Sequence, residues 1–216
     1  MAQLSEGEEP KQPWVGLEEL QELLRSIPGR PYEGRVFRWV APKYPLPSDG
    51  PKHKNCSTAG SYKVGSRMNA KGVQAPLYTS PKSWVAALEV TKYSPLTYQT
   101  LKEAVNASRD FLANERYQLF AIDVKLERVL DLVESDEHDL VTRFVGSKWD
   151  KKTTACRGLP TTAPSQVFGR AVFQAGFEAI RRPSIFLRDH WGVEYEVLDL
   201  FCPNLQSELR WQQVRP

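Results

Sequence analysis

The chain has 216 residues, of which 41% are hydrophobic and 25% are charged. This length and composition suit one well-buried globular domain and exclude a disordered or fibrous chain. The formal net charge is 29 − 26 = +3, too small to indicate nucleic acid binding. No run of about 18 apolar residues occurs, so the sequence predicts no membrane span.

The cellular location is predicted from the start of the chain and from the cysteines. Residues 1–14 are acidic and lack the apolar centre of a signal peptide. Cys56, Cys156 and Cys202 are odd in number and far apart, which predicts a reducing compartment without a disulfide framework. We therefore expect a cytoplasmic protein.

The first half of the chain begins with a polar segment, and leucines at helical spacing then predict an amphipathic helix that ends at Pro28-Gly29. This helix packs either on the main domain or on a partner. Residues 33–42 alternate as a strand, with Val36, Arg38 and Val40 on one face. After a loop-like segment at 41–64, residues 75–79 form a second strand. Ser80 and Pro81 then serve as the cap and first position of a helix that carries Glu89.

The second half predicts further helices and strands in alternation. Helical patterns cover 97–115 and 164–176, and Gly176 ends the second. Strand patterns cover 117–132, 177–187 with a break at Pro183, and 194–203, while 134–162 is irregular. We therefore predict a single compact α+β domain at 30–210, preceded by a polar tail and short helix at 1–29.

One carboxylate stands in a stretch that is otherwise apolar. Trp84 to Val90 contains no other charged residue than Glu89. An unpaired buried carboxylate costs several kcal/mol, so buried glutamates are rare unless paired. Glu89 therefore either points outward or makes a structural ion pair, or it serves a site. Arg38 presents the same problem on its strand, and the two opposite charges suggest a lined cleft or a buried pair.

The segment GSRMNAKG at 65–72 has a glycine at each end and carries Arg67, Asn69 and Lys71 between them. Glycines let a backbone approach a ligand closely, and basic side chains suit phosphate, so the loop either contacts a phosphate or is a solvated hairpin. No GxGxxG or P-loop pattern occurs, which leaves dinucleotide folds of those types without support.

Other reactive side chains give weaker signals. Ser184 follows Pro183 and either presents its hydroxyl or lies in a turn, and no GxSxG pattern surrounds any serine. His53 and Cys56 form one HxxC, but no second ligand pair follows at a suitable spacing. We therefore predict no metal site and no cofactor.

Five segments follow one another in a recognisable order: VFRWV, GSRMNAKG, PLYTS, AALEV and RPSIFL. In this order the chain resembles the RES-domain family over residues 30–205. Arg67, Tyr78 and Glu89 follow one another at intervals of 11 residues, as the loop, strand and helix of that family do. The methionine of GSRMN stands where the family usually has tryptophan.

The resemblance implies a fold like that of ADP-ribosyltransferases and a bacterial toxin that acts on NAD+, cutting its nicotinamide–ribose bond as a glycohydrolase or phosphorylase. Two alternatives stay open: transfer of ADP-ribose to a protein or nucleic acid, and NAD+ binding without turnover. NAD+ would be a substrate rather than a cofactor. An antitoxin or immunity protein, Xre-type by analogy, would cover the active site, and a homodimer is an open alternative. The location would be the cytoplasm of the producing cell or of a target cell.

The resemblance also implies roles for individual residues. Glu89 would act on the nicotinamide ribose, which Ser184 would help to hold, and Tyr78 would pack against the nicotinamide. The basic side chains of Arg38 and Arg67 would contact the diphosphate or the adjoining ribose. Asn69, beside Arg67, is included among the substrate-binding residues, and Arg38 and Tyr78 are grouped with Glu89 as catalytic.

Overall fold

Helices and strands alternate along the chain in the computed structural model, which describes residues 17–43, 66, 68–70, 72–73, 76–134, 164–207 and 209–215. The elements are α1 (Leu17–Ser26), β1 (Arg30–Val40), β2 (Leu77–Thr79), α3 (Ser83–Thr91), α4 (Leu101–Asn114), β3 (Gln118–Asp131), α6 (Pro164–Gln174), β4 (Ala179–Pro183), α7 (Ile185–Trp191), β5 (Glu196–Leu200), the 3-10 helix η2 (Cys202–Asn204) and β6 (Arg210–Val214). This is the α+β class that the sequence predicts.

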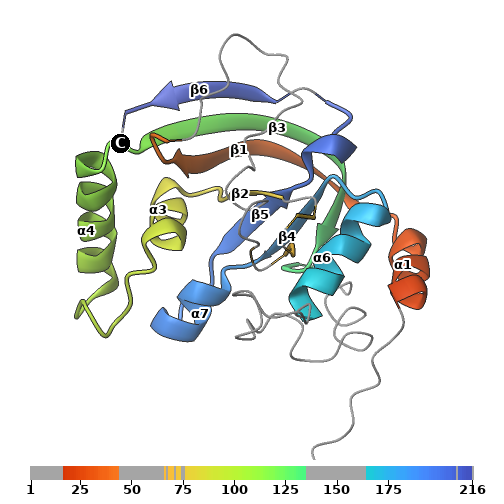
Figure 1. Cartoon of the computed structure of the whole chain (residues 1–216), viewed down its shortest axis with the longest axis horizontal. Helices are drawn as coiled ribbons and strands as arrows, with labels where there is room; N and C mark the ends of the chain where they lie inside the picture. The colour runs from red at the N-terminus through yellow and green to blue at the C-terminus, as the bar shows by residue number, and fades with distance from the viewer. Residues whose placement is uncertain are drawn as a thin grey trace, which may run out of the picture.

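The strands form one sheet in the order β1-β3-β4-β5-β2. The long strand β3 runs antiparallel to β1, and its start pairs with β6 while its end pairs in parallel with β4. The strands β5 and β2 follow, each antiparallel to its neighbour. A bridge between Phe37 and Ser80 joins β1 to the end of β2, so the two ends of the strand order meet and the sheet curls. Figure 1 shows α1 and α6 together at one end, and α3, α4 and α7 at the other.

The helix α1 packs on α6, as the packing alternative predicts. Its side chains Leu20 and Leu24 are buried in the same cluster as the α6 residues Phe168 and Val172. Arg128 of β3 ties the two helices together, as its guanidinium donates to backbone carbonyls at both helix ends, those of Ala175, Leu24 and Ile27, at 2.7, 3.3 and 3.0 Å. The leucine face of α1 is thus used inside the chain, which argues against its use as a docking or dimer surface.

The predicted element boundaries that differ most from the structure lie at Ser80 and after Pro183. The N-cap of α3 is Lys82 and not Ser80, because Ser80 belongs to the bridge with Phe37 and its hydroxyl donates to the carbonyl of Glu196 at 2.9 Å. The strand predicted through residue 187 ends at Pro183, and Ile185 to Trp191 form a helix. At Ser80, hydrogen bonds to distant residues override the local pattern. After Pro183, the N-cap at Ser184 starts a helix instead of continuing the strand.

Four further observations bear on the sequence predictions. The strand β6 is not predicted, because RWQQV carries no clear alternation of apolar residues. Cys202 is disulfide-bonded, contrary to the expectation for the cysteines, because spacing along the chain does not determine which thiols meet in space. The irregular segments predicted at 41–64 and 134–162 lie almost wholly outside the described residues. Of the helices in the described part of the chain, none is long and apolar enough to cross a membrane.

Candidate active site

Glu89 lies near the C-terminal end of α3, on a helix whose preceding turn is fully apolar. Val85 to Leu88 are buried, whereas the side chain of Glu89 remains 25% exposed. The helix ends at Lys92, which is left-handed with φ of 58° and donates its backbone N–H to the carbonyl of Leu88 at 2.8 Å. From this position the ammonium of Lys92 forms an ion pair and hydrogen bond with Oε2 of Glu89.

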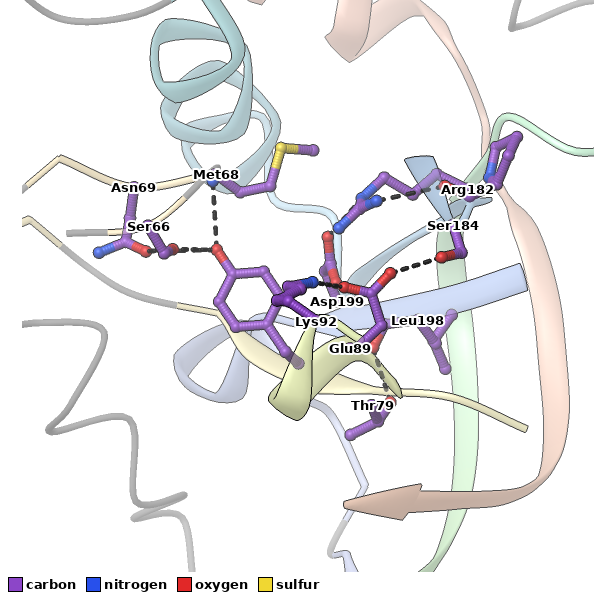
Figure 2. A network of polar contacts seen from close by, with 12 residues as sticks. Ser66, Met68, Asn69, Thr79, Glu89, Lys92, Arg182, Ser184, Leu198 and Asp199 are labelled. Carbon is purple, nitrogen blue, oxygen red and sulfur yellow. Dashed lines mark hydrogen bonds and ion pairs between the residues drawn. The ribbon is translucent and has the colours of Figure 1, made fainter. Parts of the chain in front are cut away.

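The second oxygen of the Glu89 carboxylate is bound by Ser184. Its hydroxyl donates to Oε1 of Glu89 at 2.5 Å, across 95 residues of sequence (Figure 2). Ser184 is fully buried and is the N-cap of α7, so the same oxygen accepts the N–H of Leu187 at 3.2 Å. A serine hydroxyl has one proton. Because the helix uses a lone pair, that proton is directed at Glu89.

A buried ion pair lies close to these two residues. The Nε of Arg182 donates to Oδ2 of Asp199 at 2.7 Å, and their side chains are 5% and 0% exposed. The Nη1 of Arg182 donates to the carbonyl of Pro183 at 3.2 Å, directly before Ser184 (Figure 2). Burial works to lower the pKa of Arg182, but Asp199 and Glu89 outweigh it and raise this pKa, so the guanidinium stays charged.

These charges set the protonation state of Glu89. Burial works to raise the pKa of Glu89, but the charges of Lys92 and Arg182 and the hydrogen bonds from Lys92 and Ser184 outweigh it. The pKa is therefore lower than the ordinary value of a glutamate. Glu89 is a carboxylate at neutral pH and remains one at mildly acidic pH.

Tyr78 lies on β2 opposite Asp199 of β5. Its hydroxyl accepts the N–H of Met68 at 3.1 Å, contacts Asn69 Oδ1 at 3.3 Å and is hydrogen-bonded to Ser66. Burial, followed by the charge of Asp199, raises the pKa of Tyr78, so the phenol is neutral. The hydroxyl end of this side chain is thus held by Ser66, Met68 and Asn69.

Ser66, Met68 and Asn69 are fixed to α6. Gln166 donates to the carbonyls of Ser66 and Asn69, at 2.9 and 3.2 Å. Gly169 lets the helix approach, because a Cβ there would lie only 2.1 Å from the carbonyl oxygen of Met68. The Met68 side chain is buried in the cluster shared by α1 and α6, so the methionine at this place in GSRMN is a core residue.

The structure brings the predicted site residues into contact in two groups, Glu89 with Ser184 and Tyr78 with Asn69 and Arg38. Glu89 accepts a hydrogen bond from Ser184, and Tyr78 is hydrogen-bonded to the buried Asn69. The Nη1 of Arg38 donates to the backbone carbonyl of Tyr78 at 3.0 Å. The ion pair of Glu89 is with Lys92 rather than with Arg38. Arg67 lies outside the described residues.

Three charged residues of the site were missed. Asp199 repeats the signal of Glu89, since it is a lone charge in the apolar run VLDLFC. Arg182 stands beside Arg181, and a local pattern does not reveal which of two adjacent arginines faces a site. Lys92 follows the helix and gives no sequence signal, because its orientation depends on the left-handed backbone.

Comparison with known families decides the assignment. The RES domain model matches residues 35–213, which is most of the chain. The chain belongs to the RES-domain family. The resemblance drawn from the five segments is therefore confirmed. Comparison with curated proteins gave no match.

Among solved structures, this RES-domain chain is similar to one in the crystal structure of the M. tuberculosis MbcT–MbcA toxin–antitoxin complex. The TM-score is 0.52 at 13% sequence identity, over 93% of this chain and 95% of that chain. A likeness at this identity concerns the fold, and it agrees with the prediction of a single α+β domain.

Proposed function

We propose that this protein is an enzyme that cleaves the nicotinamide–ribose bond of NAD+, with Glu89 as the catalytic carboxylate. The observation that carries the proposal is the state of Glu89: an ionised, partly exposed carboxylate that a buried serine and a lysine hold in one orientation. Membership of the RES-domain family supports the choice of NAD+ as the substrate.

The chemistry suits a fixed carboxylate. Nicotinamide leaves as a neutral base from a cationic ring, so its departure needs little acid assistance. Positive charge then develops on the ribose in an oxocarbenium-like transition state, and a nearby carboxylate stabilises that charge. Because Ser184 and Lys92 already orient Glu89, little reorganisation is needed when the charge develops.

The remaining predicted residues have supporting roles in this proposal. Arg38 and Arg67 would bind the diphosphate, since guanidinium groups match phosphate oxygens. Tyr78 would offer an aromatic face to the cationic nicotinamide, and the neutral phenol agrees with that role. Asn69 would act through Tyr78, because it is buried and bonded to the tyrosine hydroxyl.

We further propose a toxin role with a protein partner that restrains it. The similar solved structure is a toxin–antitoxin complex, which supports this role for a chain of the same fold. A cell that makes an NAD+-depleting enzyme needs an inhibitor for it. Expression of the chain alone should lower cellular NAD+ and arrest growth, and unchanged NAD+ with normal growth would contradict the toxin role.

The reaction is tested directly by incubating purified protein with NAD+, with and without inorganic phosphate, and separating the products by chromatography. Release of nicotinamide is the expected result. ADP-ribose as co-product indicates hydrolysis, and a phosphorylated co-product that depends on phosphate indicates phosphorolysis. Label from NAD+ on a macromolecule would instead favour ADP-ribose transfer. No nicotinamide from folded protein under any of these conditions would contradict the proposal.

The role of Glu89 is tested by Glu89→Gln, which keeps the shape and removes the charge. Loss of the carboxylate should reduce kcat by about 10³-fold or more, with little change in the far-UV spectrum. Glu22→Gln, on the exposed face of α1, is the matched control and should keep full activity. Full activity of Glu89→Gln would remove this residue from the mechanism.

A further inference from the structure

We propose that Arg182, anchored by Asp199, is a positioning residue that holds the Glu89–Ser184 pair in place and maintains Glu89 as a carboxylate. This inference rests on the proposed function for its catalytic meaning, whereas its physical content concerns this chain alone. It adds a buried cation to a site that family resemblance builds from other residues.

The strand register places Arg182 on the face of the sheet that carries the site. Tyr78 of β2 lies opposite Asp199 of β5, which in turn lies opposite Ile180 of β4. Side chains alternate along a strand, so Arg182 shares the face of Ile180. Arg182, Asp199 and Tyr78 therefore lie on one face.

The hydrogen bonds of Arg182 connect the two parts of the site. One arm is held by Asp199 at 2.7 Å, and another binds the carbonyl of Pro183 at 3.2 Å. That carbonyl belongs to the peptide that leads into Ser184, whose hydroxyl binds Glu89 at 2.5 Å. Arg182 thereby holds the backbone that presents the serine, and its charge acts on Glu89 as well.

Stability alone is a poor reason for this ion pair. Removing two charges from water is expensive, and apolar residues of similar volume often stabilise a core as well or better. The pair is nevertheless almost fully buried beside the one partly exposed carboxylate of α3. A requirement for fixed positive charge near Glu89 explains a buried arginine at this place.

The neighbouring residue, Arg181, provides the matched control. It points to the opposite face and forms ion pairs with Asp131, Glu134 and Glu196, at 3.0, 2.8 and 2.5 Å. The charges that lower the pKa of Glu89 are those of Lys92 and Arg182. Arg181→Gln therefore removes the same charge from the same strand without removing the charge that acts on Glu89.

The experiment follows the Glu89 carboxyl by NMR in full-length protein that carries ¹³C at the glutamate side-chain carboxyls, with the Glu89→Gln spectrum assigning the signal. In Arg182→Gln the titration midpoint should move to higher pH, because the carboxylate loses a favourable charge. Arg182→Lys should keep the Glu89 midpoint close to its wild-type value, because the positive charge remains. Arg181→Gln should leave the midpoint unchanged. The double variant Arg182→Gln/Asp199→Asn leaves no isolated buried charge and gives the same readout if the single variant does not fold.

A second readout is nicotinamide release. The acid limb of the pH–rate profile should move to higher pH in the Arg182 variants that lack the charge, and kcat/KM should fall by about 10²-fold through misplacement of Ser184. An unchanged Glu89 midpoint in both the single and double variants would overturn the proposal. The NMR titration does not depend on turnover, so failure of the proposed reaction and failure of this inference give different results.

Discussion

Glu89 and Glu178 have the same sequence pattern, since each is a single charge in a short apolar stretch. Their surroundings in the fold are opposite. Glu178 is fully buried, and its carboxylate accepts three backbone N–H groups, those of Glu127, Arg128 and Gln206, at 2.6, 3.0 and 2.7 Å. Glu89 is partly exposed and is bound by the side chains of two other residues.

The difference between the two sets of hydrogen-bond donors indicates which carboxylates in apolar surroundings can take part in a reaction. Backbone donors are held by the fold and cannot leave, so the Glu178 carboxylate joins β3 to the segment after η2 and has no capacity for a ligand. Side-chain donors such as Lys92 can move aside, and an exposed edge lets a substrate approach. A lone carboxylate in an apolar stretch therefore indicates a special environment, and its donors decide whether that environment is structural or functional.

The largest expected effect that separates the two carboxylates comes from Glu178→Gln. The amide group must turn its NH2 towards backbone donors that need an acceptor, and buried unsatisfied donors cost about 1–3 kcal/mol each. We expect the free energy of unfolding to fall by about 3 kcal/mol in urea denaturation. The same substitution at Glu89, which is partly exposed, should change it by less than about 1 kcal/mol. Equal stability losses in the two variants would break the comparison.

A second effect concerns Arg128, the basic residue that binds Glu178. Arg128 donates its backbone N–H to Glu178, caps α1 and α6 with its guanidinium, and lies 4.3 Å over the ring of Phe177. Arg128→Ala should lower the free energy of unfolding by about 2 kcal/mol and speed hydrogen exchange in α1. Arg170→Ala, on the exposed face of α6, is the control and should be neutral. Unchanged exchange in α1 would show that the leucine contacts alone hold this helix.

The smallest effect concerns Lys92, whose side chain is half exposed. Burial raises the pKa of Glu89 and Lys92 lowers it, so Lys92→Met should raise this pKa. The acid limb of NAD+ cleavage should then move to higher pH, and the loss of rate at neutral pH should be much smaller than in Glu89→Gln. The stabilisation that the ionised Glu89 contributes is present above its unfolded-state pKa and is lost as the pH falls through the folded-state pKa, so the variant loses it at a higher pH. Lys102→Met, on α4, is the control, and an acid limb that moves equally in both variants would contradict a specific Lys92–Glu89 pair.

Much of the fold follows from local patterns. Helical spacing predicted α1, α4 and α6, and alternation predicted β1, β3 and β5, because each element buries a single face against the core. The errors occur at Ser80, whose partners lie far along the chain, at residues 185–187, where the cap at Ser184 starts a helix, and at β6, whose sequence has no clear alternation. Ser80 bonds residues 37 and 196, and no local pattern contains that information.

The site was predicted in part, and for a different reason. Glu89 stands out because a charge in an apolar helix is costly, and Ser184 was noticed because a proline precedes it. The resemblance of five segments then brought these residues together, and their contact at 2.5 Å agrees with it. The ion pairs of Glu89 with Lys92 and of Arg182 with Asp199 could not be predicted from spacing along the chain.

Periodicity and composition therefore determined the α+β class and the helix that carries Glu89, and the resemblance to a family added Ser184 as its neighbour in the site. The class and the helix follow from the sequence because burial of apolar faces is a local, repeating requirement. The charge state and orientation of Glu89 depend on the folded chain, since they arise from a left-handed residue at the end of α3, the cap of α7 and a buried pair on β4 and β5. Electrostatic interactions act over a few ångströms in space, and residues that are 95 positions apart in sequence become neighbours only when the sheet has curled.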